Sequence, residues 1–201
     1  MKHEAYAYTS KSDFLSDLTQ LKRGLPFLEK HSVLNRTLEI NGRTIRNRLL
    51  AQPIEGGDAL ESGAPSERTV KRYRELAAGG SGVIWMESIS VNQEGKSVPR
   101  QMWLRQETTE AFSNLVSKIH ETKKDTFVVA QLTHSGSNSN PDGKKLAVCA
   151  FENPCLPKDN YRIITDKELD QLRDDYIGAA VLAQQAGFDA VDIRACHGYL
   201  L

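Results

Sequence analysis

Short apolar segments that alternate with segments of helical periodicity constrain the fold of this chain more than any other feature. Residues 82–88 (GVIWMES) are nearly all apolar, as in a strand that is buried on both faces of a parallel sheet, and residues 126–132 (TFVVAQL) and 189–193 (DAVDI) predict two further strands. Residues 49–51 (LLA) are apolar enough to predict a buried strand before them. Strands that alternate with helices in this way predict an α/β fold with a parallel sheet.

The helices between these strands are predicted from their caps and their apolar faces. One begins after Ser66 and ends at Gly79-Gly80, and another begins with the capping box Thr165–Glu168 and ends at Gly187. The apolar faces have the spacing of amphipathic helices. Their members are Val70, Tyr73 and Ala77 in the first helix, Phe112, Leu115, Val116 and Ile119 in the second, and Leu169, Leu172, Tyr176, Ile177 and Ala180 in the third.

The first 32 residues differ in pattern from the remainder of the chain. We expect residues 1–32 to form an N-terminal helical extension, with a helix capped by Ser12 and stopped by Gly24 and Pro26. Residues 33–201 then form the α/β part.

Two connections within residues 33–201 have patterns of their own. Asn41-Gly42 lies between two alternating runs and predicts a β-hairpin. Residues 138–164 are polar and contain prolines, and the length of this segment predicts a lid or a binding loop.

Composition excludes several classes of partner. The chain has 26 Lys+Arg and 26 Asp+Glu, so no net field attracts nucleic acid or anionic lipid. No apolar run approaches the roughly 20 residues that a membrane span needs. The three cysteines have no C-x-x-C spacing, which argues against a disulfide scaffold or a zinc site. We therefore expect a cytoplasmic, reduced protein that binds neither nucleic acid nor membrane.

Polar residues follow the predicted strands, and their positions favour a barrel over a doubly wound sheet. A dinucleotide fold requires G-x-G-x-x-G after the first strand, and QPIEGGDALESGAPS does not contain it. In a barrel the strand ends converge on one mouth, which holds the active site. The polar residues at these ends are Gln52, Glu55, Glu87, Ser88, Gln131, His134, Arg194, His197 and Tyr199.

Four motifs in series, IRNRLLAQP, GGSGVIWMESISVNQEG, VVAQLTHSG and AGFDAVDIRACHGYLL, resemble the Old Yellow Enzyme family of NADH:flavin oxidoreductases. The resemblance covers residues 33–201. It implies a (β/α)8 barrel with FMN across its carboxyl-terminal mouth. It also implies that NADH or NADPH reduces the flavin, which passes hydride to a small-molecule acceptor, an activated alkene or a related compound.

The resemblance assigns five residues to the flavin. Gln131 matches a glutamine that binds the polar edge of the pyrimidine, for which an amide suits because it donates and accepts. Pro53 and Ile54 match positions whose backbone lies against the ring. Ser88 matches a small residue beside the ring. Glu55 stands where relatives have threonine or cysteine near the flavin C4 oxygen.

The resemblance also assigns three catalytic residues. Tyr199 matches the tyrosine that protonates the substrate, and a phenol with an ordinary pKa near 10 remains protonated at neutral pH. His197 matches one member of a pair that binds the substrate carbonyl. Arg194 replaces the histidine that is the other member, and it suits either an acceptor carboxylate or the flavin pyrimidine. We hypothesise that Glu55 and Arg194 form an ion pair; the alternative is that Glu55 points into solvent.

Residues 33–201 supply about four of the eight strand–helix units of a barrel. We therefore expect an N-terminal half of a longer, truncated enzyme, without the late strands that bind phosphate. Exposed edges of such a half would favour a homo-oligomer. Two alternatives are a barrel fragment with only an association role, and a non-flavin metal-dependent enzyme that uses His134, Asp192 and His197.

Overall fold

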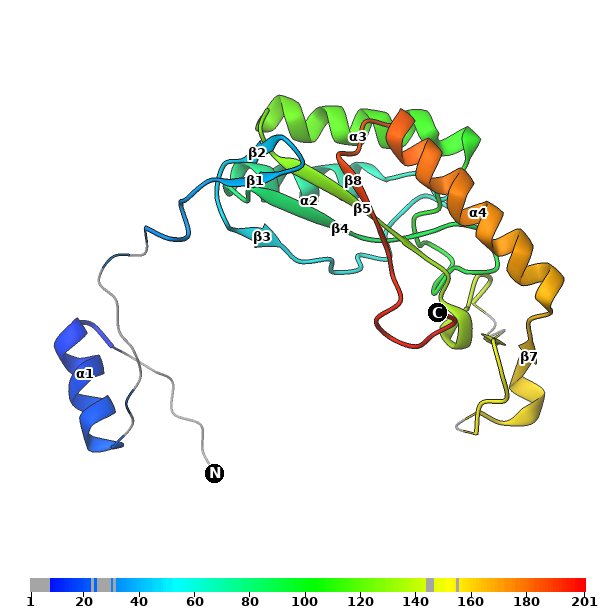
Figure 1. Ribbon diagram of the computed structural model, residues 1–201, viewed down its shortest axis with the longest axis horizontal. Coiled ribbons are helices and arrows are strands. Elements are labelled where there is room, and N and C mark those ends of the chain that lie inside the picture. The colour runs from blue at the N-terminus through cyan, green and yellow to red at the C-terminus, as the bar shows by residue number, and fades with distance from the viewer. Residues whose placement is uncertain (1–7, 23, 25–29, 31, 144–146, 155) are drawn as a thin grey trace. The chain divides into compact units, whose positions relative to one another are not determined.

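A computed structural model describes residues 8–22, 24, 30, 32–143, 147–154 and 156–201 (Figure 1). The chain divides into two compact units, Met1–Ser32 and Val33–Leu201. Within the described residues, no helix is long and apolar enough to cross a membrane.

The first unit contains helix α1 (Lys11–Gln20), and its cap differs from the prediction. Ser10, rather than Ser12, is the N-cap, because its side chain accepts a hydrogen bond from the Asp13 backbone. The helix ends at Gln20, before the predicted stop at Gly24. Pro26, the other predicted stop, lies outside the described residues.

The second unit is built on one parallel sheet with the strand order β3-β4-β5-β8. Helices α2, α3 and α4 pack beside this sheet (Figure 1). The strands are β3 (Leu50–Ala51), β4 (Val83–Ser90), β5 (Phe127–Thr133) and β8 (Ala190–Ile193), and the helices are α2 (Glu67–Ala78), α3 (Thr109–Thr122) and α4 (Asp166–Gln185). The predicted α/β pattern is therefore confirmed.

Local sequence signals explain where these elements begin and end. Ser66 and Thr165 cap α2 and α4 with reciprocal capping boxes, as predicted for Thr165. The apolar faces predicted for the first two helices are confirmed, since their members pack in the core against apolar side chains of β4 and β5. The largest fully buried side chains of this core are Phe112, Ile84, Met86, Ile89, Met102, Leu104, Leu115, Ile119 and Leu132.

The predicted hairpin is confirmed. Strands β1 (Leu38–Ile40) and β2 (Arg43–Ile45) pair in antiparallel fashion. Asn41 and Gly42 connect them with φ angles of 49° and 77°, the left-handed conformation that this turn requires. The Arg43 guanidinium forms an ion pair with Asp189, which in turn accepts the Val128 backbone N–H at 2.8 Å. The hairpin is thus anchored at the amino-terminal end of β5.

The prediction of a buried first strand is wrong. Strand β3 has only two residues, and Leu50 is 40% exposed. Strand β3 pairs with β4 on one side only, so it is an edge of the sheet. Strand β8 is the other edge, with Val191 and Ile193 exposed. The apolar pattern of these segments correctly predicts strands, but among the described elements nothing covers the side chains of Leu50, Val191 and Ile193.

The segment predicted as a lid or binding loop contains regular structure. Strands β6 (Ala147–Cys149) and β7 (Tyr161–Ile163) pair in parallel. A short 3-10 turn, η2 (Gly136–Asn138), leads into the segment, and a second, η3 (Lys158–Asn160), precedes β7. A third such turn, η1 (Gln106–Thr108), precedes α3. Residues 147–149 are buried, so this part of the segment packs against the body of the unit.

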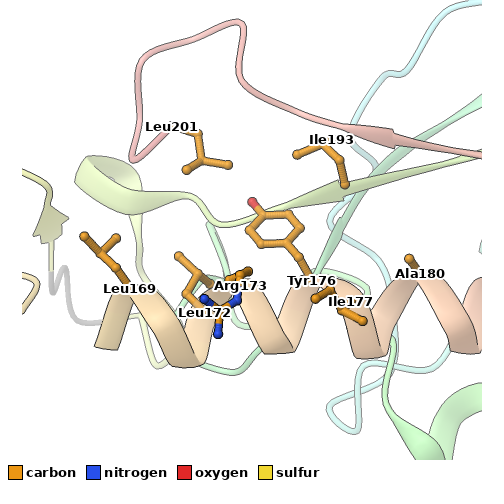
Figure 2. A pocket seen from close by; sticks show the side chains of 8 residues that line it. All are labelled: Leu169, Leu172, Arg173, Tyr176, Ile177, Ala180, Ile193 and Leu201. Carbon is orange, nitrogen blue, oxygen red and sulfur yellow. The ribbon is translucent and has the colours of Figure 1, made fainter. Parts of the chain in front are cut away.

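The apolar face of α4 is only partly buried, which corrects the prediction for that helix. Leu172 and Tyr176 are buried, whereas Ile177 is 56% exposed and Leu169 is also exposed. These residues and Ile193 border an apolar groove of about 420 Å³ between α4 and β8 (Figure 2). The remaining residues of its lining are Arg173, Ala180 and Leu201.

Candidate active site

The carboxyl ends of the parallel strands bring several of the predicted polar residues together, but Glu87, which was predicted at the same mouth, turns toward α2 instead. Ser88 of β4 is in register with Gln131 of β5, and Gln131 is in register with Asp192 of β8. The Arg194 backbone extends the ladder, since its N–H donates to the Leu132 carbonyl at 2.9 Å. Parallel pairing places consecutive strand ends at one edge, so residues far apart in sequence become neighbours.

An irregularity in β4 sets the direction of Ser88. The register between β4 and β5 shifts between Trp85 and Ser88. Glu87 then contacts α2, while Ser88 reaches the Glu55 side chain. Such bulges are common beside active sites because they change the direction of a side chain.

Glu55 is the centre of this cluster. Its carboxylate accepts hydrogen bonds from Ser88 Oγ at 2.7 Å, Arg194 Nη1 at 2.7 Å and Ser97 Oγ at 3.3 Å. The hypothesis of a Glu55–Arg194 ion pair is confirmed, and the alternative of a solvent-directed Glu55 is wrong. Burial favours a higher pKa for Glu55, but the hydrogen bonds from Ser88 and Arg194 and the positive charge of Arg194 outweigh it. The pKa of Glu55 is therefore below its usual value, and the group is ionised at neutral pH.

Arg194 connects Glu55 to the two predicted catalytic residues. Arg194 Nε donates to His197 Nδ1 at 3.2 Å, so this imidazole nitrogen is an acceptor and the proton of a neutral ring is on Nε2. Cys196 Sγ lies 3.0 Å from the same nitrogen. The guanidinium lies 5.4 Å from the centre of the Tyr199 ring, and the His197 and Tyr199 rings are 5.1 Å apart. The structure therefore places Arg194, His197 and Tyr199 in one group.

A close backbone contact positions the loop that carries Tyr199. Ser137 N–H donates to the Tyr199 carbonyl at 3.0 Å. Gly136 has a φ of 49°, and a Cβ atom there would overlap the Tyr199 backbone. Only glycine combines this conformation with this approach, so the turn after β5 determines where Tyr199 lies.

Gln131 points to the same side of the sheet as Asp192. Gln131 Nε2 donates to Asp192 Oδ2 at 2.8 Å, and Trp85 Nε1 donates to the same oxygen at 3.1 Å. The carboxylate fixes the orientation of the Gln131 amide, because a carboxylate only accepts. The carbonyl oxygen and second N–H of Gln131 are the groups that a ligand's polar edge would use.

Residues 53–55 form the loop after β3 that faces this cluster. Pro53 is half-buried, and Ile54 is 75% exposed immediately before Glu55. The next N–H, of Gly56, donates to Glu87 Oε2 at 2.7 Å. The loop is thus tied to β4 just before it reaches Ala59 in the core.

The sequence did not predict a network of ion pairs that lies behind this loop. Arg72 of α2 donates to both oxygens of Asp58, at 2.6 and 3.0 Å, and to Glu87 Oε1 at 2.6 Å. Tyr73 Oη donates to the same Glu87 oxygen at 3.2 Å. The hydrogen bonds to Asp58 and Glu87 and their charges raise the pKa of Arg72, which stays charged. The feature of the sequence that could have indicated this network is Glu87, a carboxylate within an apolar strand.

His134 does not join the cluster. It is 3% exposed, its Nδ1 accepts the Gly136 N–H at 3.1 Å, and burial lowers its pKa to about 4. A neutral, packed ring agrees with a structural role. Over the part of the chain that the structure describes, no three His, Cys, Asp or Glu side chains are placed to hold a metal ion. His134, Asp192 and His197 therefore do not assemble as the metal-dependent alternative requires.

Comparison with known proteins identifies the family. The sequence model of the NADH:flavin oxidoreductase / NADH oxidase family matches residues 34–201. The chain belongs to this family. It is 30% identical over 168 residues to an NADH oxidase of Thermoanaerobacter brockii, and the alignment covers 81% of this chain and 25% of that protein. It is 28% identical over 167 residues to an NADPH dehydrogenase of Listeria welshimeri, covering 79% of this chain and 46% of the relative.

A solved structure agrees with the fold assignment. The Old Yellow Enzyme homologue from Zymomonas mobilis superposes with a TM-score of 0.70 and 27% identity, over 83% of this chain and 49% of that one. The predicted resemblance to Old Yellow Enzymes is confirmed, as is an α/β fold that forms part of a (β/α)8 barrel. The chain spans about half or less of the length of these relatives.

Proposed function

We propose that this chain is part of an FMN-dependent NAD(P)H oxidoreductase of the Old Yellow Enzyme type that reduces an activated alkene or a related small molecule. The observation that carries this proposal is the cluster of Glu55, Ser88, Arg194, His197 and Tyr199 at the carboxyl ends of the strands. Family membership supplies the class of reaction, and the cluster supplies the residues for it.

The donor set of this edge fits the polar side of a flavin ring. A flavin pyrimidine presents both N–H and carbonyl groups, and Gln131 offers an amide whose orientation Asp192 fixes. Exposed Ile54 and half-buried Pro53 offer apolar contact for the ring plane. Ser88 is small enough to leave room beside them. We propose that Pro53, Ile54, Glu55, Ser88 and Gln131 hold the flavin, which when bound accepts hydride from NADH or NADPH and passes it on.

The remaining residues of the cluster bind and protonate the acceptor. His197 Nε2–H and the Arg194 guanidinium are donors for an acceptor carbonyl oxygen, on which negative charge builds up during reduction. Tyr199 gives its phenol proton to the substrate carbon. The close approach of the two rings keeps the donor to oxygen and the donor to carbon on one side of the site.

FMN titration of the chain, followed by flavin fluorescence, tests the cofactor assignment. We expect weak binding, because the resemblance places the phosphate site on barrel strands beyond the four described. Gln131→Leu should weaken it by about tenfold, equivalent to one net hydrogen bond of about 1.4 kcal/mol. The matched control is Gln171→Leu, on the exposed side of α4. Equal affinity of wild type and Gln131→Leu would refute the flavin role of Gln131, and tight one-to-one binding would refute the expected weakness.

We also propose that the open sheet edges associate with a second copy of the chain. A twofold axis parallel to the strands would set exposed β8 of one copy beside β3 of the other, in the parallel direction in both places. Sedimentation velocity should show a dimer for wild type and a monomer for Ile193→Lys. Val98→Lys, at another exposed apolar residue, is the control. A monomeric wild type would disprove this association.

A further inference from the structure

The Arg194 charge is compensated before any ligand arrives. The Arg194 side chain is 12% exposed and that of Glu55 is 39% exposed, and they meet at 2.7 Å. His197 accepts a hydrogen bond from Arg194 through Nδ1, so this nitrogen carries no proton and adds no positive charge beside the guanidinium. The ion pair therefore has no net charge where the proposed acceptor would bind.

Glu55 is held in place by two hydrogen-bond donors besides Arg194. Ser88 Oγ donates to the same carboxylate oxygen as Arg194, and Ser97 Oγ donates to the other. Ser88 is itself fixed, because Gln101 Nε2 donates to Ser88 Oγ at 2.8 Å and to its carbonyl at 3.1 Å. Both Ser88 and Gln101 are buried. The carboxylate cannot turn from Arg194 without leaving these donors unpaired.

We propose that Glu55 sets the charge preference of the acceptor site, so that the site takes a neutral carbonyl compound and disfavours a carboxylate. This inference rests on the proposed function, in which Arg194 contacts the acceptor. A neutral carbonyl needs one N–H and leaves the ion pair intact. A carboxylate at Arg194 would lie beside the Glu55 carboxylate in a partly buried site, where like charges repel more strongly than in water. Glu55 thus acts on specificity through Arg194.

Binding of two probes of nearly equal shape tests the proposal. trans-Cinnamate is an anion and trans-cinnamamide is neutral, and ligand-observed NMR gives their dissociation constants with the chain. Wild type should prefer the amide. Glu55→Gln should raise the cinnamate-to-cinnamamide affinity ratio by about tenfold, which corresponds to about 1.4 kcal/mol. Glu55→Asp, which keeps the charge, should retain the wild-type ratio.

Two further variants separate the specific effect from a change in net charge or in folding. Glu121→Gln removes one negative charge from an exposed pair on α3 and should leave the ratio unchanged. In an Arg194→Gln background, Glu55→Gln should no longer raise the ratio, because the cation that attracts cinnamate is absent. A loss of folding would lower both affinities together and would leave their ratio unchanged.

The outcomes distinguish this inference from the proposed function. An unchanged ratio in a Glu55→Gln variant that keeps the wild-type affinity for cinnamamide overturns the inference, and so does failure of every variant to bind either probe. Probe binding with the expected ratio, combined with no FMN binding, would support the role of Glu55 while contradicting the flavin assignment. FMN binding without the change in ratio would do the reverse.

Discussion

Replacement of Glu87 by glutamine tests the buried ion network that holds the loop carrying Glu55. Glu87 is 3% exposed, and both of its carboxylate oxygens accept hydrogen bonds. Oε1 accepts from Arg72 and Tyr73, and Oε2 accepts from the Gly56 backbone. Glutamine has the same shape, but whichever way its amide is turned the –NH2 group faces a donor. The variant therefore loses the charge and at least one hydrogen bond.

The expected cost follows from the burial of this network. Removing one partner of a buried ion pair costs about 3–5 kcal/mol. Arg72 keeps its two hydrogen bonds to Asp58 and its side chain is 31% exposed, so we expect the lower end, about 3 kcal/mol. With a urea m-value of about 2 kcal/mol/M for a unit of this size, the unfolding midpoint should fall by about 1.5 M.

Urea unfolding followed by tryptophan fluorescence measures this change in one unit only. The chain has two tryptophans, Trp85 and Trp103, and both lie in Val33–Leu201. Glu121→Gln is the matched control, since its exposed pair with Lys118 should contribute less than about 1 kcal/mol. If the midpoint of Glu87→Gln falls no further than that of the control, the buried network does not stabilise the fold as argued.

Three other substitutions have effects whose direction the structure determines. The pKa of His134 is about 4 in the folded unit against an ordinary 6.5, so the unfolded chain binds the proton first as pH falls. The stability from the neutral ring is complete above pH 6.5 and is lost toward pH 4, by about 3 kcal/mol. His134→Asn keeps an acceptor for Gly136, and its free energy of unfolding should depend less on pH across that range. Parallel pH profiles of the variant and the wild type would contradict this. Gly56→Ala should destabilise by about 1–3 kcal/mol, because its methyl group overlaps the anchored Arg72 guanidinium. Gly178→Ala, in open space on α4, should instead stabilise by about 0.5–1 kcal/mol, and equal unfolding midpoints of the two variants would refute the argument.

Sequence patterns predicted most of the fold because its signals are local. Capping boxes, a hairpin turn and the apolar faces of α2 and α3 each depend on residues within one element or its boundary. The exact cap of α1 was missed because Ser10 and Ser12 both precede the same helical run, and only the backbone conformation at Ser10 decides between them. The two strands within 138–164 were missed because each has only three residues.

The candidate site was predictable where it consists of strand-end residues, and not where it depends on packing between elements. The Glu55–Arg194 pair was one of two alternatives that their strand-end positions allowed, and the structure confirms it although β3 and β8 are opposite edges of the sheet. The Arg72 network was not expected, since it requires α2 to pack on β4 and the β4 bulge to direct Glu87 toward that helix. Such a network has no linear signature, apart from a carboxylate in an apolar strand.

The wrong predictions of burial have one physical cause. Leu50 and Ile177 lie in segments whose apolar pattern is that of core residues, yet both are exposed. Periodicity records which face of an element is selected for burial, but burial also needs an element to cover that face. Leu50 lies on β3 and Ile177 on α4, which packs beside β8, so the two residues mark the two boundaries of the sheet as described. At the second boundary the uncovered apolar face of α4 forms the groove with β8, which is the physical reason that a correct apolar pattern gave a wrong prediction of burial.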